Sequence, residues 1–237
     1  MTYDLWYWPG LPGRGEFVRL FLELHGLSYR DCGPDEGAEA LMDDLKSRQG
    51  KVGEPYAPPY LADGDICVSQ VAHILAYLSD KHGPTVEDKQ LLFWLIQLQL
   101  DITDIVAEVH DVHHPVASGL YYDDQKDAAA RAAKDFREER IPKWFAHFER
   151  AAGAVDGDWI GGARPSHVDT SLFQLIEGLE YAFPKRMKAV RGDYPKLFAL
   201  RDSVRDLEPV AAYLASDRRQ AFNEDGIFRH YPELDAA

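Results

Sequence analysis

The stretch PPYLADGDICVSQVAHILAYL, residues 58–78, decides the fold of this chain. Two short apolar runs, 60–62 and 66–69, flank the turn Asp63-Gly64-Asp65, a pattern typical of a β-hairpin. Apolar residues then recur at helical spacing through 71–78, so a helix is expected directly after the second strand. The stretch therefore predicts two strands and a helix in immediate succession.

The residues before this stretch alternate between strand and helix patterns. An aromatic, apolar strand is predicted at 3–8, and the breakers of Pro9-Gly10-Leu11-Pro12-Gly13 end it. Helical spacing begins at Arg14 and stops at His25-Gly26. A second strand is predicted at 28–31, and a more polar helix at 36–48. The first eighty residues thus predict a small α/β unit in the order βαβαββα.

The residues after His82-Gly83-Pro84 carry almost no strand signal. The spacing of apolar residues predicts a run of helices, in which Pro115 ends the first and Pro142 kinks the second. These helices are expected at 86–114, 123–152, 169–179, 196–204 and 208–215, before an irregular aromatic tail at 222–231. The predicted fold class is α/β plus all-α. It comprises an α/β domain over 1–80, a linker near 79–85 and a helical domain over 86–237.

Charge excludes several kinds of partner. Asp and Glu number 40 against 26 Lys and Arg, for a formal net charge of −14. Nucleic acids and anionic membranes are bound by clustered Lys and Arg, so neither is an expected partner. The i, i+4 pair His110 and His114 has no acidic metalloprotease motif beside it, so no metal site is predicted and capping or surface roles are favoured.

The expected compartment is the cytoplasm. Only Cys32 and Cys67 are present, and their spacing fits neither a disulfide framework nor a zinc site. The first residues lack the basic region and apolar stretch of a signal peptide. No apolar run approaches the ~20 residues that span a bilayer.

Three local motifs occur in a fixed order along the chain. The first is Leu5-Trp6-Tyr7-Trp8-Pro9 followed by 13–20, the second is 58–78, and the third is Trp159-Ile160-Gly161-Gly162 followed by Ser166-His167-Val168-Asp169. Ser166 and Asp169 have the spacing of a helix capping box. Together the motifs resemble those of cytosolic glutathione S-transferases, in particular a divergent, bacterial-like member of the tyrosine-type classes. This resemblance implies a thioredoxin-like N-terminal domain followed by an all-helical one.

The resemblance also implies reduced glutathione as cosubstrate, whose thiol must ionise before it attacks an electrophile. A free thiol has a pKa of about 8.5, so a donor aimed at the sulfur favours the thiolate. Tyr7 matches the catalytic tyrosine of the family, and its alternative role is that of one more core aromatic. Arg14 is the second catalytic candidate, or else a solvated or ion-paired residue of the first helical turn. The loop 10–13 contains neither serine nor cysteine, which argues against the serine-type and cysteine-type mechanisms.

The binding residues that the resemblance implies include two departures from the family pattern. Pro59 matches the cis-proline, but the residue before it is Pro58, which can offer glutathione only its carbonyl because it has no N–H. Gln70 matches the glutamine that contacts the γ-glutamyl group. Val71 follows where Ser or Thr is usual, so the amide is kept and the hydroxyl is lost. Each missing hydrogen bond weakens binding by roughly 0.5–1.5 kcal/mol.

Further candidates are more distant from these motifs. Trp8, next to Tyr7, is a candidate for the glutathione side of the site. Asp101 matches an acidic residue that reaches the amino group of glutathione across a homodimer, and a surface role is the alternative. Arg48 or Lys51 is a weak candidate for binding the glycine carboxylate. The resemblance places the dimer interface on the long helix and on the helix that follows Gln70.

The pocket for the second substrate is expected between the two domains. His110, His113 and His114, near Tyr121 and Tyr122, suit a partly polar wall of that pocket. The tail aromatics Phe222, Phe228 and Tyr231 are expected to pack on the helical domain rather than cover the pocket. The predicted function is conjugation of glutathione to an electrophilic, hydrophobic small molecule. The alternatives are glutathione-dependent isomerisation, ether cleavage or peroxide reduction, and non-catalytic binding of an apolar ligand.

Overall fold

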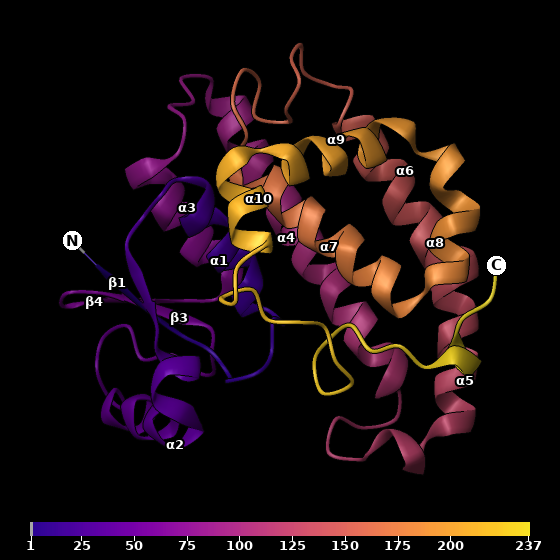
Figure 1. Ribbon diagram of the computed structural model, residues 1–237, viewed down its shortest axis with the longest axis horizontal. Helices are drawn as coiled ribbons and strands as arrows, with labels where there is room; N and C mark the ends of the chain where they lie inside the picture. The colour runs from indigo at the N-terminus through magenta and orange to yellow at the C-terminus, as the bar shows by residue number, and fades with distance from the viewer. Residues whose placement is uncertain (1) are drawn as a thin grey trace.

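The computed structural model describes residues 2–237, and its N-terminal third is built on a four-stranded mixed sheet (Figure 1). The strand order is β2-β1-β3-β4, in which β1 pairs parallel with β2 and antiparallel with β3. The strands and helices of this part are β1 (Tyr3–Trp6), α1 (Gly15–Leu24), β2 (Tyr29–Asp31), α2 (Cys32–Ser47), β3 (Tyr60–Asp63), β4 (Ile66–Ser69) and α3 (Val71–His82). The predicted βαβαββα order is confirmed, although β1 ends one residue before Tyr7.

Helices cover both faces of this sheet because successive strand residues point to opposite sides. Leu5 and Leu61 belong to the same buried cluster as Phe17 of α1 and Ile74 of α3. On the other face, Trp6 and its neighbour Tyr60 pack in a separate cluster with residues of α2. Helix α2 bends at Gly37, which has a φ of 90° inside an otherwise helical segment.

The rest of the chain is helical, as predicted, and lies on one side of the sheet part (Figure 1). Its α-helices are α4 (Lys89–His113), α5 (Lys126–Asp135), α6 (Ile141–Ala151), α7 (His167–Ala182), α8 (Pro184–Val190), α9 (Pro195–Asp206) and α10 (Glu208–Leu214). Short 3₁₀ turns are η1 (Tyr122–Asp124), η3 (Arg191–Asp193) and η4 (Pro232–Leu234), and η2 (Phe136–Arg140) is a π-helical turn. In residues 2–237, no helix combines the length and the apolar character needed to cross a membrane.

Two features of the helical part differ from the prediction. The irregularity expected at Pro142 lies in the preceding turn, the π-helical η2, and α6 begins at Ile141 with the proline in its first turn. A proline cannot donate to the fourth residue before it and its ring crowds that carbonyl, so the preceding turn widens instead. Helix α8 was not predicted, because Pro184 and three basic residues hide a short apolar side formed by Met187 and Val190.

Helix α7 begins at the predicted capping box, and this prediction is confirmed. The hydroxyl of Ser166 accepts a hydrogen bond from the Val168 amide at 3.3 Å. The carboxylate of Asp169 accepts from the Ser166 amide at 2.7 Å and from the Ile160 amide at 2.9 Å. Nearly all of α7 is buried, between α1, α4 and α9. The box therefore fixes the central helix of the molecule.

The C-terminal tail packs along the helices, as predicted, and also reaches the sheet part. The ring of Tyr231 stacks on Tyr122 with centroids 3.8 Å apart. Phe228 lies directly on Gly178 of α7, where a Cβ atom would come within 2.4 Å of its ring. The side-chain amide of Asn223 donates to the carbonyl of Gly10 at 2.8 Å. The tail thus joins the helical part to the loop that follows β1.

Candidate active site

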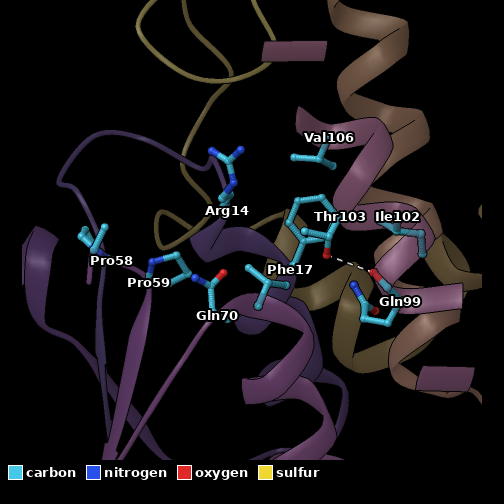
Figure 2. Close-up of a pocket in the computed structure, with 11 residues that line it drawn as sticks. Arg14, Phe17, Pro58, Pro59, Gln70, Gln99, Ile102, Thr103 and Val106 are labelled. Carbon is cyan, nitrogen blue, oxygen red and sulfur yellow. Dashed lines mark hydrogen bonds between the residues drawn. The ribbon is translucent and has the colours of Figure 1, made fainter. Parts of the chain in front are cut away.

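A cavity of about 210 Å³ lies between the sheet part and α4 (Figure 2). One wall is formed by α1, the end of α3 nearest β4 and the segment before β3, and the facing wall by α4. The lining residues are Arg14, Phe17, Ala57, Pro58, Pro59, Gln70, Val71, Gln99, Ile102, Thr103 and Val106. Five of the eight candidate site residues, Arg14, Pro58, Pro59, Gln70 and Val71, are therefore brought together.

The α/β wall of the cavity depends on unusual backbone conformations. The Pro58–Pro59 peptide bond is cis and leads directly into β3. Gln70 has a φ of 71°, a region that residues other than glycine rarely adopt. The Gln70 side chain makes no capping bond to α3, and the intrahelical bonds begin with the Ile74 N–H, which donates to the Gln70 carbonyl at 2.8 Å, so the N–H groups of residues 71–73 have no partner within the helix. A helix N-terminus with free donors favours an anionic group.

Tyr7 lies immediately after β1, behind the loop that carries Arg14. Its hydroxyl accepts a hydrogen bond from the backbone N–H of Arg14 at 3.0 Å, and its side chain is only 5% exposed. Burial raises the pKa of the Tyr7 hydroxyl, while the Arg14 N–H bond and the charges of Arg14 and Arg19 partly oppose this rise. The phenol therefore keeps its proton near neutral pH and can act as a hydrogen-bond donor.

Close contacts with glycines fix the position of the Tyr7 ring. A Cβ atom on Gly13 would lie 2.3 Å from the Tyr7 hydroxyl oxygen, and one on Gly15 would lie 2.7 Å from the ring. Gly13 also has a positive φ of 42°. Only glycine fits at these two positions without moving the tyrosine. Tyr7 itself does not line the cavity and is one hydrogen bond away from it, through Arg14.

A buried ionic network holds the loop between Tyr7 and α1. The Arg19 guanidinium donates to the carbonyl of Pro12 at 3.2 Å and to the Asp31 carboxylate at 2.6 Å. It also pairs with Glu16 at 3.3 Å, and Glu16 accepts from the Tyr213 hydroxyl at 2.8 Å. Residues of the sheet part and of α10 in the helical part therefore hold this loop in place.

The α4 wall contains four residues that the sequence analysis did not identify. Gln99, Ile102, Thr103 and Val106 follow the i, i+3, i+4, i+7 spacing of one helix face. The Thr103 hydroxyl donates to the carbonyl of Gln99 at 3.0 Å (Figure 2). The sequence did contain a signal for this wall, because Gln99 is a polar residue on the apolar side of an amphipathic helix.

Two further candidates lie outside the cavity. Trp8 is half-buried and packs with Trp6 on the α2 side of the sheet. Asp101 is on α4, but its carboxylate pairs with the His147 ring at 3.0 Å, next to α6. Helical geometry explains this placement, because Asp101 is turned well away from the face that carries Gln99 and Val106.

The three histidines near the end of α4 contact backbone carbonyls or a neighbouring side chain. His113 bonds through Nε2 to the carbonyl of Ile227 at 2.9 Å, and burial lowers its pKa to about 3. His114 bonds to the carbonyl of Leu120 at 3.0 Å, and His110 approaches Asp111 at 3.3 Å. Across residues 2–237, no group of three His, Cys, Asp or Glu side chains is arranged to hold a metal ion.

Comparison with known proteins places the whole chain beside one family. Residues 110–217 match the family model described as glutathione S-transferase, C-terminal domain. A glutathione S-transferase of Plasmodium falciparum is 21% identical over 217 residues, covering 89% of this chain and 94% of that protein. Human glutathione S-transferase Mu 3 is 27% identical over 223 residues, covering 90% and 88% of the two chains.

Solved structures agree with this assignment at the level of the fold. A Pi-class glutathione S-transferase of Onchocerca volvulus superposes with a TM-score of 0.69 at 20% identity, covering 90% of this chain and 92% of the other. Prostaglandin synthase D of Nilaparvata lugens gives 0.70 at 17% identity, with coverage of 92% and 98%. The family match lies in the helical part, whereas the similarity to the relatives and the shared fold extend over both parts of the molecule. The chain therefore resembles glutathione S-transferases, in sequence and in fold, along most of its length.

Proposed function

We propose that this protein is a glutathione transferase that joins the sulfur of reduced glutathione to an electrophilic, hydrophobic small molecule. The proposal rests on the Tyr7 hydroxyl. Because this oxygen already accepts the Arg14 N–H at 3.0 Å, its own proton remains available for donation. A glutathione sulfur placed at the mouth of the loop would receive that proton in a hydrogen bond.

Tyr7 acts as a donor that favours the ionised thiol. A free thiol has a pKa of about 8.5 and is mostly protonated at neutral pH. A fixed phenol donor, the nearby Arg14 guanidinium and the N-terminus of α1 all stabilise negative charge on sulfur. The thiolate then attacks the electrophilic carbon, and either a leaving group departs or the electron pair of a double bond moves to the neighbouring atom. The thiol proton passes to solvent.

The α/β wall holds the tripeptide in this proposal. The carbonyl of Pro58 accepts a hydrogen bond from the cysteinyl N–H, and Gln70 contacts the γ-glutamyl group. The γ-glutamyl carboxylate meets the amide of Val71 at the start of α3, where the free N–H groups and the helix dipole favour an anion. The missing N–H of Pro58 and the missing hydroxyl at Val71 lower the affinity without removing the site.

A homodimer is also proposed, with α4 in its interface. Phe93 and Leu100 are 66% and 51% exposed, and their i, i+7 spacing puts them on one face of α4. An exposed apolar stripe on a long helix is typical of a surface that another chain covers. In such a dimer Asp101 would leave the single-chain pairing with His147 and reach the glutathione of the partner subunit. The proposed compartment is the cytoplasm, in keeping with two free cysteines.

Calorimetry with wild-type protein and Tyr7→Phe tests the proposal, with the ultraviolet thiolate band followed in parallel. We expect both proteins to bind glutathione and only the wild type to give the thiolate signal. Absence of binding to the wild type at millimolar glutathione would refute the transferase function. A thiolate signal of equal size in Tyr7→Phe would refute the role of Tyr7 alone.

A further inference from the structure

Gln99 is a fully buried polar residue with no partner for its side chain. It is 1% exposed, and neither the nitrogen nor the oxygen of its carboxamide forms a hydrogen bond with residues 2–237. The residue nevertheless lines the cavity, on the α4 wall opposite Pro59 and Gln70 (Figure 2). A buried amide that lacks both a donor and an acceptor partner is costly, and native proteins normally satisfy such groups with a protein atom, an ordered water or a ligand.

The surroundings of Gln99 on this wall are neutral. Its neighbours Ile102 and Val106 are apolar, and the Thr103 hydroxyl proton is already donated to the backbone. A charged ligand group placed against this wall would be desolvated with no counter-ion on the wall itself, because Arg14, which also lines the cavity, lies on the facing wall. A neutral group that offers a donor and an acceptor together would satisfy both atoms of the carboxamide. A rotation about the side-chain bonds of Gln99 turns the amide toward the cavity that the residue already lines.

We propose that Gln99 selects the second substrate, and that this substrate is an electrophile bearing a primary carboxamide or a lactam. The inference rests on the proposed transferase function, since it assumes that glutathione occupies the opposite wall. Gln99 is a specificity residue in this role. It pairs its N–H with the ligand carbonyl and its own carbonyl with the ligand N–H.

Glutathione itself does not match the free groups of Gln99. Its ends carry carboxylates and an ammonium group. Its peptide-type bonds are trans, so the N–H and the C=O of each amide point in opposite directions. Neither amide can pair with both atoms of one carboxamide. A primary amide or a lactam holds its donor and acceptor on the same side and can do so.

The test uses glutathione S-conjugates whose substituents end in a primary carboxamide after successively longer methylene spacers. Each is paired with an alkyl conjugate of equal length. Their dissociation constants are measured by calorimetry for wild type, Gln99→Leu and Gln99→Met, with the exposed Gln97→Leu on the same helix as control. At the best spacer length we expect the wild type to favour the carboxamide about tenfold. Both Gln99 variants should lose this preference and bind glutathione itself as the wild type does.

Two outcomes would overturn the inference. One is the absence of carboxamide preference at every spacer length in the wild type. The other is an equal loss of affinity for glutathione and for all conjugates in both Gln99 variants, which would assign the residue to the glutathione side or to folding. Melting temperatures separate these roles, because removing an unpartnered buried amide should raise stability, whereas removing a structural one lowers it.

Benzamide alone provides an arm that does not depend on glutathione. Binding of benzamide to the wild type, weakened about tenfold in Gln99→Leu, would support the Gln99 site even if glutathione failed to bind. That combination would refute the proposed transferase function and leave the amide site standing. Binding of glutathione without any amide preference would refute the Gln99 inference alone.

Discussion

The α/β wall of the cavity is shaped by backbone conformation, whereas the α4 wall is shaped by side chains on a regular helix. On the first wall, a cis peptide at Pro59, a positive φ at Gln70 and the free end of α3 place the polar groups. On the second, the groups that face the cavity are simply those on one side of α4, led by Gln99. Backbone conformation can hold one constant ligand, while helix side chains can be exchanged without refolding. In the proposed function, backbone groups would therefore hold the constant substrate and helix side chains the variable one.

The largest effect is expected where the α4 wall depends on its support by α7. Asp169→Ala would leave the buried amides of Ile160 and Ser166 without their acceptor. We expect a loss of about 3 to 5 kcal/mol in the free energy of unfolding, measured by urea denaturation. The exposed Asp158→Ala is the control for loss of a carboxylate. Equal stability of the two variants would mean that the capping box does not stabilise the helical part.

Acid should lower the free energy of unfolding by an amount comparable to that of Asp169→Ala, because it disrupts a contact between α3 and α7. His167 of α7 bonds through Nδ1 to the Ser79 hydroxyl of α3 at 2.9 Å, and burial lowers its pKa to about 4. The folded state holds the neutral ring, whereas the unfolded state takes up a proton near pH 6.5. Stability should therefore be complete above pH 6.5 and fall by about 3 kcal/mol as the pH drops to 4. Denaturation across this range should show a shallower fall in His167→Gln but not in the exposed His73→Gln.

The α/β wall should be sensitive to a single methyl group. In Gly13→Ala the new Cβ atom would displace the Tyr7 hydroxyl, which lies 2.3 Å from its position. Loss of one preorganised donor to a developing anion lowers kcat by roughly 100-fold. Gly10→Ala is the matched control, because Gly10 also has a positive φ but nothing within 4 Å of the added atom. If both variants lose the same activity, backbone strain rather than the Tyr7 contact is responsible.

A smaller effect, on the affinity for glutathione, would show whether the partner subunit contributes a residue to the site. Asp101→Asn should raise the dissociation constant of glutathione about threefold to tenfold if Asp101 reaches the ligand of the partner subunit. Calorimetry on the dimer measures this change, with the exposed neighbour Asp104→Asn as a control for charge. Unchanged affinity in Asp101→Asn would mean that Asp101 only pairs with His147 and that one chain forms the whole glutathione site.

The fold and the α/β wall could be predicted because their residues are locally unusual. Adjacent prolines at 58 and 59, a Gly turn at 64 and the spacing of Ser166 and Asp169 each restrict the backbone over a few positions. Their order along the chain then identifies the architecture. In the structure, Pro58 and Pro59 line the cavity together with Gln70 and Val71.

The α4 wall could not be predicted because it depends on distant packing. The spacing of apolar residues puts Gln99 rather than Gln97 on the apolar side of α4, but only the packing of α4 against α3 and α7 decides that this side lines a cavity. Asp101 illustrates the same limit, since its pairing with His147 joins residues 46 positions apart. Helix α8 was missed for a related reason, because its two buried residues are outnumbered by charged ones.

The bond between Asn223 and Gly10 has a consequence for biosynthesis. It joins residues 213 positions apart, and the ion pair between Arg219 and Glu16 connects the same two regions. A ribosome therefore releases the loop beside Tyr7 long before it makes the residues that hold that loop in place. The sheet and the bond of Arg19 to the Pro12 carbonyl can form early, but the Gly10 end of the loop lacks its bond to Asn223 until residue 223 has been translated. A chain truncated before that point would keep the tyrosine and lose this second attachment of the loop beside it.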